Sequence, residues 1–139
     1  SKEFKIDIIG GDTISNNKLD ISITIISKTK KPLLRTGIKK GDYLAYTGKL
    51  GGVKKDLDRL FENKKIDKNS RFIKPILRQK FIKKSASFLR AGMDISDGLF
   101  LDLEKLAKAN NIGFNFFKKI KRGKACSGEE YEMLIAIDP

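Results

Sequence analysis

Apolar and polar residues alternate along two stretches near the start of the chain, residues 4–9 and 19–26. In the second stretch one face carries only large apolar side chains, namely Leu19, Ile21, Ile23 and Ile25. A period of two residues is typical of a β-strand with one buried face, so both stretches are predicted to be strands. A third strand is predicted over 43–47, a short β-favouring run that ends at Gly48.

The apolar spacing becomes helical in the middle of the chain, where apolar residues recur every three or four positions. This spacing predicts one helix near 52–63 and a second near 75–90, which starts at a proline. A third helix is expected to begin after Gly98 and to end near Asn110. Its apolar face is formed by Leu99, Leu103 and Leu106.

Shorter apolar runs predict further strands around 93–95, over 114–117 and over 133–137, with a basic loop over 118–124. Strands and helices therefore alternate along the chain in the order β-β-β-α-α-β-α-β-β. The expected fold class is α/β (α+β), a mixed sheet packed with helices.

Composition narrows the possible chemistry. Of 139 residues 40% are hydrophobic, and no apolar run is long enough to span a membrane. The first residues contain no apolar stretch of the kind found in secretory signals, so a cytoplasmic location is expected. Cys126 is the single cysteine and His is absent, which excludes an intramolecular disulfide and zinc-finger spacings. A bound metal would be a hard cation held by oxygen, and magnesium is the natural choice.

The chain is strongly basic, with a net charge of +13. The excess of Lys and Arg lies in residues 1–93, whereas residues 94–139 are close to neutral. Such a charge raises the alternative of a basic module that binds nucleic acid without catalysis. No basic motif with interleaved aromatic residues accompanies it, which favours lysines on solvated faces and disfavours nucleic-acid binding.

Three acidic turns could carry chemistry, and the first is Gly10-Gly11-Asp12-Thr13. The glycines let a backbone approach a phosphate closely, and Asp12 offers a carboxylate to a cation. The alternative is a tight turn in which Asp12 accepts a hydrogen bond from its own backbone.

The second turn is Asp94-Ile95-Ser96-Asp97-Gly98, where a predicted strand meets a predicted helix. Two carboxylates three residues apart across this bend can face one cleft, where magnesium would relieve their repulsion and bridge phosphate oxygens. Ser96 would then donate to phosphate near the start of the helix. In the alternative, Ser96 or Asp97 is only the helix N-cap.

The third turn, residues 127–132, holds three glutamates beside a glycine. Glu129 and its neighbours can recognise a cationic substrate or hold a metal; the alternative is a solvated acidic turn or the start of a short helix. Among the many cations, Arg35 is the candidate for clamping phosphate oxygens, with an exposed loop arginine as its alternative. No Walker A or protein-kinase glycine-rich loop is present, so an ATP site here is of another type.

Taken in order, these turns resemble the thiamine-monophosphate kinase family, within the aminoimidazole-ribonucleotide-synthetase-like ATP-binding superfamily. The segments that carry the resemblance are Gly10-Gly11-Asp12-Thr13, Arg35-Thr36-Gly37 with Gly41-Asp42, Thr47-Gly48 to Leu50-Gly51, Asp94-Ile95-Ser96-Asp97-Gly98-Leu99 with Asp102-Leu103, and Gly128-Glu129 with Tyr131-Glu132. The resemblance implies magnesium-assisted transfer of phosphate from ATP to thiamine monophosphate, giving thiamine diphosphate. It identifies no catalytic acid or base, since the acceptor phosphate is already anionic.

By motif, the resemblance places Gly11, Asp12, Arg35 and Ser96 on ATP. It places three carboxylates on magnesium, those of Asp12, Asp94 and Asp97. Glu129 would face the thiamine substrate.

The resemblance also implies a domain organisation. Residues 1–26 would be the last strands of an N-terminal ATP-binding domain, and residues 27–139 a C-terminal α/β domain. The chain would then be the C-terminal portion of a protein that forms a homodimer, and would be inactive alone. Another ATP-dependent enzyme of the same superfamily remains the alternative.

Overall fold

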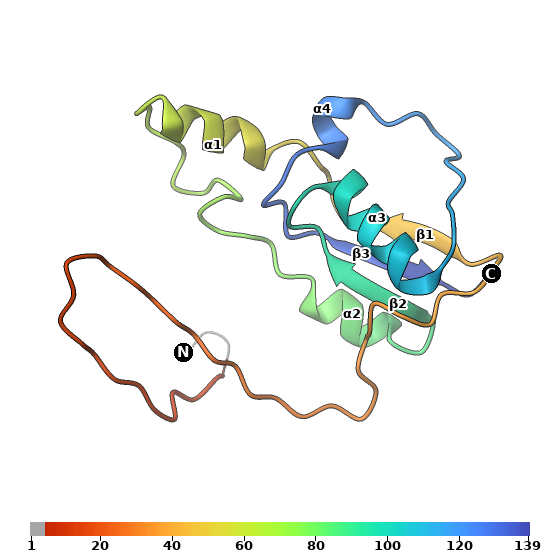
Figure 1. Cartoon of the computed structure of the whole chain (residues 1–139), viewed down its shortest axis with the longest axis horizontal. Helices are drawn as coiled ribbons and strands as arrows, with labels where there is room; N and C mark the ends of the chain where they lie inside the picture. Colours follow the sequence, from red (N-terminus) through yellow and green to blue (C-terminus); the bar gives the residue numbers. More distant parts are fainter. Residues whose placement is uncertain (1–4) are drawn as a thin grey trace.

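A three-stranded antiparallel sheet organises the chain in the computed structural model, which describes residues 5–139 (Figure 1). The strands are β1 (Tyr43–Tyr46), β2 (Leu89–Asp94) and β3 (Met133–Ile137), in the spatial order β1-β3-β2. The last strand in the sequence is therefore the central one. Leu134 of β3 lies opposite Tyr46 on one side and Met93 on the other.

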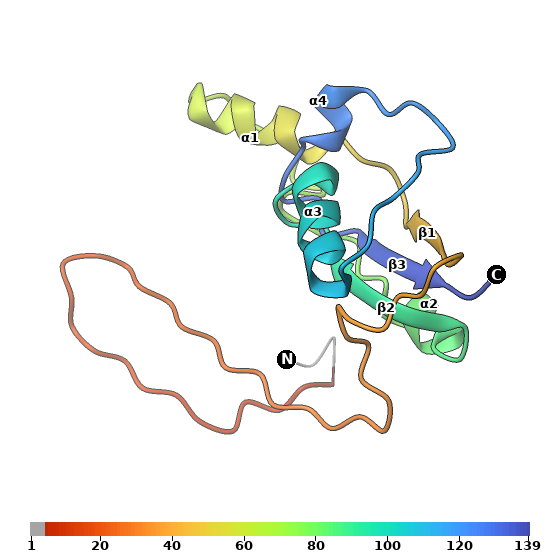
Figure 2. The same ribbon diagram turned by 45° about the vertical axis from the view of Figure 1, so that its right-hand side comes forward.

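Four helices accompany the sheet: α1 (Val53–Phe61), α2 (Gln79–Ser85), α3 (Leu99–Asn110) and the single turn α4 (Arg122–Ala125). Helix α3 lies against one face of the sheet, and α2 lies on the other side, where it lines a groove together with Met133 (Figure 2). Helices α1 and α4 lie close together beyond the start of α3. No helix within residues 5–139 is long and apolar enough to cross a membrane.

The hydrophobic core lies between α3 and the sheet. Its buried members come from α3, α4, β2, β3 and the loops between these elements: Leu50, Met93, Ile95, Leu99, Leu103, Leu106, Ala125 and Leu134. The three leucines of α3 recur every three or four residues, so they share the face turned to the sheet. Asn111 ends the helix in the left-handed conformation, with φ of 53°.

Truncating the centre of this core tests its contribution to stability. Leu106 is fully buried, so Leu106→Ala is expected to lower the free energy of unfolding by about 2–5 kcal/mol, measured by urea denaturation. Leu101→Ala is the matched control, because Leu101 lies on the same helix and is 55% exposed. Equal losses in the two variants would show that α3 does not pack as described.

The two N-terminal strands predicted from the sequence are wrong for the described residues. Residues 5–26 are extended or irregular and form no strand, and Phe4 lies outside the described residues. The alternating side chains from Leu19 to Ile25 are 74–87% exposed. A strand requires backbone pairing with a neighbouring strand, and the sheet within residues 5–139 consists of β1, β3 and β2; the N-terminal segment loops away from it (Figure 1).

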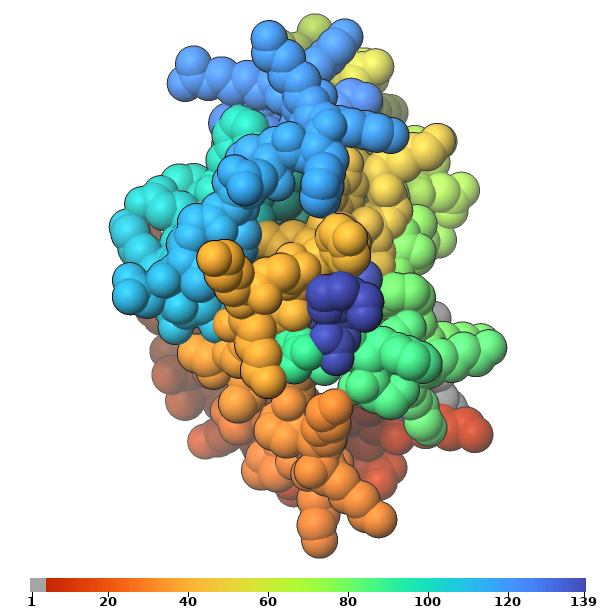
Figure 3. Space-filling view, turned by 90° about the vertical axis from the view of Figure 1, so that its right-hand side faces the viewer, coloured from red at the N-terminus to blue at the C-terminus, as the bar shows by residue number. Residues whose placement is uncertain are grey.

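Two other local predictions were also wrong. The helix predicted over 75–90 is reduced to α2, because from Leu89 onward the backbone pairs with β3 instead. The predicted strand 114–117 is irregular: Phe116 packs edge-on against Phe100 and Phe117 contacts Tyr43. On the face shown in Figure 3, this segment lies beside the part of the chain that contains β1.

The remaining predictions agree with the structure. The strands over 43–47 and 133–137, the helix over 52–63 and the helix after Gly98 are confirmed, and the mixed helix-and-sheet class is correct. The strand end at 93–95 is the end of β2, and the basic loop 118–124 contains α4. The domain boundary after residue 26 stays a prediction.

Candidate functional site

Two loops that are far apart in sequence lie side by side at one end of β2 and β3. Backbone N–H groups of Glu129 and Tyr131 donate to the carbonyl oxygens of Ser96 and Ile95, at 2.7 and 2.9 Å. The contact is so close that a Cβ at Gly128 would lie 3.0 Å from the Ser96 carbonyl oxygen. The structure therefore brings together four of the predicted site residues: Asp94, Ser96, Asp97 and Glu129.

A buried carboxylate on α3 fixes the first of these loops. Asp102 is fully buried and accepts the backbone N–H groups of Ser96 and Asp97, at 3.0 and 3.1 Å. Lys105 bridges the carboxylates of Asp102 and Asp97, which raises the pKa of Lys105. The N-cap of α3 is Gly98, without a side-chain cap, so the N-cap alternative for Ser96 or Asp97 is wrong.

Sequence reasoning assigned no role to Asp102. The available signal was that Asp102 is an acidic residue in the first turn of the predicted helix and follows Asp97 by five positions. An acidic group there is favoured by the helix dipole, and here it satisfies N–H groups that precede the helix.

The second loop is held in an uncommon backbone conformation. Glu129 and Tyr131 have positive φ values of 57° and 50°, a region that non-glycine residues seldom occupy. The Tyr131 hydroxyl donates to the Glu129 carboxylate, and this bond, followed by burial, raises the pKa of Tyr131. The negative charges of Glu129, Asp94 and Asp97 raise it further. The carboxylates of Glu129, Asp94 and Asp97 thus act on the same hydroxyl group, and such a grouping of negative charges favours a nearby cation.

The carboxylates suit magnesium shared with a ligand better than a metal enclosed by protein. Asp94 is half-buried and its carboxylate makes no hydrogen bond or ion pair with any residue from 5 to 139, whereas Asp97 pairs with Lys105. Within the same residues no group of three or more Asp, Glu or Cys is placed to hold a metal. Magnesium commonly binds one or two carboxylates and completes its shell with water and substrate phosphates.

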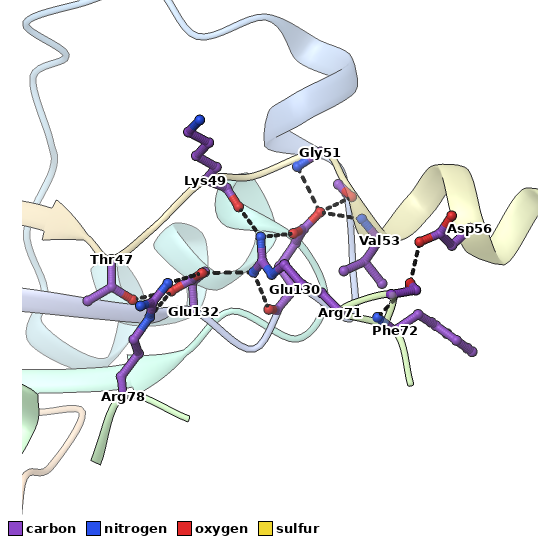
Figure 4. A network of polar contacts seen from close by, with 12 residues as sticks. Thr47, Lys49, Gly51, Val53, Asp56, Arg71, Phe72, Arg78, Glu130 and Glu132 are labelled. Carbon is purple, nitrogen blue, oxygen red and sulfur yellow. Dashed lines mark hydrogen bonds and ion pairs between the residues drawn. The ribbon is translucent and has the colours of Figure 1, made fainter. Parts of the chain in front are cut away.

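Behind the Glu129–Tyr131 loop lies a buried ion cluster, formed by Glu130, Glu132, Arg71 and Arg78 (Figure 4). Arg78 donates two hydrogen bonds of 2.7 Å to the Glu132 carboxylate, and Arg71 donates a third of 2.8 Å. Thr47 also donates to Glu132. The expected alternative for residues 127–132, a solvated acidic turn, is therefore wrong for two of its three glutamates.

The ion cluster holds several segments together. Arg71 comes from the irregular stretch between α1 and α2, Arg78 from the start of α2, and Thr47 from the end of β1. Arg71 also donates to the carbonyl oxygens of Lys49 and Glu130, at 2.7 and 3.0 Å. No local sequence signal marked this cluster, because Arg71 and Arg78 lie 61 and 54 positions from Glu132 in the sequence.

Gly48 lies against this cluster and offers a test of it. Its φ is 63°, and an added Cβ would lie 2.1 Å from Glu132 Oε1 and 2.4 Å from Arg78 Nη2. Gly48→Ala is therefore expected to push the pair apart and to lower stability by about 1–3 kcal/mol. Gly52→Ala, where nothing lies within 4 Å, is the control in the same thermal denaturation experiment. Unchanged stability in Gly48→Ala would contradict the described packing.

The other predicted site residues lie elsewhere. Gly11 and Asp12 are exposed in the N-terminal segment, and Asp12 accepts the backbone N–H of Thr13 at 2.8 Å. Arg35 is exposed near the C-terminal end of α3, where its carbonyl accepts a hydrogen bond from Asn110. Asp97 lies before the opposite end of this helix, about 18 Å away by helix rise. The structure does not bring Gly11, Asp12 or Arg35 to the two loops.

Curated proteins similar to this chain share one name, thiamine-monophosphate kinase. The protein from Leptospira interrogans is 33% identical over 152 residues, which cover 94% of this chain and 49% of that protein. The protein from Aquifex aeolicus is 28% identical over 115 residues, covering 78% of this chain and 38% of that protein. The chain thus spans half or less of the length of these relatives. No protein-family model matches the sequence.

Solved structures give the same picture for the fold. One, described as "AaThiL complexed with AMPPCP and TMP", has a TM-score of 0.65 at 23% identity and covers 78% of this chain and 43% of that one. Thiamine-monophosphate kinase from Stenotrophomonas maltophilia has a TM-score of 0.59 at 20% identity, over 78% and 43%. Together with the 33% identity along nearly the whole sequence, this places the chain in the thiamine-monophosphate kinase family.

Proposed function

We propose that the protein carrying this chain transfers the terminal phosphoryl group of ATP to thiamine monophosphate, producing ADP and thiamine diphosphate. Family membership supports the reaction class. The observation that carries the proposal is the convergence of the Asp94–Gly98 loop with the Gly128–Tyr131 loop, held by backbone hydrogen bonds of 2.7 and 2.9 Å. This convergence sets the carboxylates proposed to bind magnesium and the cationic substrate beside each other.

Four side chains of the two loops have a proposed role. Asp94 and Asp97 hold magnesium, and the Ser96 hydroxyl contacts ATP near the start of α3, where the helix dipole favours negative charge. Glu129 faces the positively charged ring of thiamine. Magnesium would neutralise the charge that develops on the transferred phosphoryl group, and the chain's own residues position the reactants.

Gly11, Asp12 and Arg35 remain proposed ATP contacts, with Asp12 also on magnesium. None of them reaches the two loops within this chain, so these residues would join the site in an assembled homodimer. The segment holding Gly11 and Asp12 exposes several large apolar side chains, which suits association: Ile8, Ile9, Ile14, Leu19 and Ile21. A cytoplasmic location stays a prediction.

A direct assay tests the proposed reaction. The intact protein is incubated with ATP, magnesium and thiamine monophosphate, and thiamine diphosphate is measured by chromatography, with thiamine and other phosphorylated acceptors as controls. Thiamine diphosphate formed only when thiamine monophosphate and magnesium are both present supports the proposal. Turnover with another phosphate acceptor alone would replace it with the alternative of a different ATP-dependent enzyme of the superfamily.

A further inference from the structure

Glu130 lies between the two left-handed residues of the candidate site and points away from it. Its side chain is fully buried, and Oε1 accepts three hydrogen bonds: from the backbone N–H groups of Gly51 and Val53, at 2.7 and 3.3 Å, and from the Ser127 hydroxyl, at 2.5 Å. Oε2 lies 3.6 Å from Arg71 Nη1 and has no hydrogen-bond partner among the described residues.

These contacts link the candidate site to a separate part of the chain. Gly51 and Val53 belong to the glycine-rich loop after β1 and to the first turn of α1, where unpaired N–H groups favour a negative charge. Ser127 belongs to the loop that enters the site. One carboxylate therefore holds the loop after β1, the start of α1 and the site loop in a single arrangement (Figure 4).

The backbone on either side of Glu130 contacts the other loop of the candidate site. The N–H groups of Glu129 and Tyr131 donate to the 95–96 turn, while the side chain between them is fixed by Gly51, Val53 and Arg71. Positive φ at both flanking residues is unfavourable and persists only where the surroundings hold it. Here the buried Glu130 carboxylate and the two backbone hydrogen bonds keep Glu129 and Tyr131 in this conformation.

We infer that Glu130 is a positioning residue for the proposed kinase site: it touches no substrate, but its buried carboxylate holds Glu129 and Tyr131 facing Asp94 and Asp97. The inference rests on the proposed function for its consequence in catalysis. Its structural content stands on the hydrogen bonds alone, so the two can be tested separately.

Amide hydrogen exchange followed by NMR tests the structural content. Glu130→Gln keeps the shape but places an amide nitrogen, instead of Oε2, toward the Arg71 guanidinium. We expect the amides of Gly51, Glu129 and Tyr131 to exchange about tenfold faster or more, because local opening becomes easier, while the central β3 amides stay protected. Uniform acceleration along the chain, or no change at these three amides, would overturn the inference.

Two further variants make the result interpretable. Ser127→Ala removes one donor to the same carboxylate oxygen and is expected to give a smaller change at the same amides, which keeps the test available if Glu130→Gln does not fold. Leu106→Ala weakens the core and leaves every hydrogen-bonding group around Glu130 in place. It should accelerate exchange across the whole domain, without singling out Glu129 and Tyr131.

Kinetics of the intact protein test the consequence in catalysis. Glu130→Gln is expected to raise the KM for thiamine monophosphate about tenfold and to change the KM for ATP much less, since Glu129 is the residue proposed to face thiamine. An equal rise in both KM values, or none, would overturn the positioning role even if exchange changes as expected. A wild-type protein without turnover would instead refute the proposed function and leave the exchange result intact.

Discussion

Replacing Glu132 with glutamine is expected to lower the free energy of unfolding by about 3–5 kcal/mol, because it leaves two buried or half-buried arginines without their carboxylate. Glu132 is 0% exposed and accepts hydrogen bonds from Arg78, Arg71 and Thr47. Domain stabilities are typically about 5–15 kcal/mol, so the variant should be close to unfolding. Urea denaturation followed by circular dichroism measures the change.

Glu104→Gln is the matched control for this experiment. Glu104 also pairs with a cation, Lys108, at 2.6 Å, but both side chains are more than half exposed on α3. Water and salt screen such a pair, so no measurable loss is expected. Should the two substitutions prove equally harmless, burial of the Glu132 cluster would be refuted.

The same carboxylate predicts a pH dependence with a definite sign. Burial alone would raise the pKa of Glu132, but the hydrogen bonds from Arg78 and Thr47, with the charges of Arg78 and Arg71, outweigh it and lower the pKa. A lowered pKa in the folded state stabilises the protein fully above the unfolded value of about 4.3. This contribution is lost as the pH falls through the folded value. The gap between wild type and Glu132→Gln should therefore narrow below about pH 4.

The elements that could be predicted from the sequence are those that carry a clear local pattern of apolar and polar residues. Helix α3 combines a local apolar period with an asparagine stop, and β3 is a short apolar run between polar residues. By contrast, the boundary between α2 and β2 is set by pairing of Leu89 with Ile137, 48 positions along the chain. Helical spacing over 75–90 contains no information about that pairing, so tertiary structure overrode it.

The candidate site shows the same division. The acidic turn at 94–98 was recognisable because a strand end, two carboxylates and a helix start are adjacent in sequence. The roles of Asp102 and of the Glu130–Glu132 cluster could not be recognised from the sequence, because the partners of these residues become neighbours only after folding. Arg71 and Arg78 are two of 30 basic residues, and nothing in their local sequence separates them from the exposed ones.

Asp94→Asn is expected to reduce kcat/KM of the intact protein about 100- to 1,000-fold, the loss typical of removing one group that stabilises transition-state charge. Asp94 is half-buried, and its carboxylate makes no hydrogen bond or ion pair with any residue from 5 to 139. Because no cationic side chain pairs with the Asp94 carboxylate, this carboxylate is available to bind a cation from solution. Initial rates at increasing magnesium concentration measure the loss, and part of it should be recovered at high magnesium.

Stability separates this role from a structural one. An unpaired carboxylate among other carboxylates destabilises the protein that lacks the metal, so Asp94→Asn should leave the free energy of unfolding unchanged or slightly higher. Asp58→Asn, on the exposed face of α1 and paired only with Lys54, should change neither stability nor turnover. If Asp94→Asn instead lost stability and kept its activity, Asp94 would be a structural residue. Loss of a metal ligand lowers activity and leaves stability unchanged, whereas loss of a structural carboxylate lowers stability and leaves activity unchanged. Measuring both quantities therefore decides between the two roles.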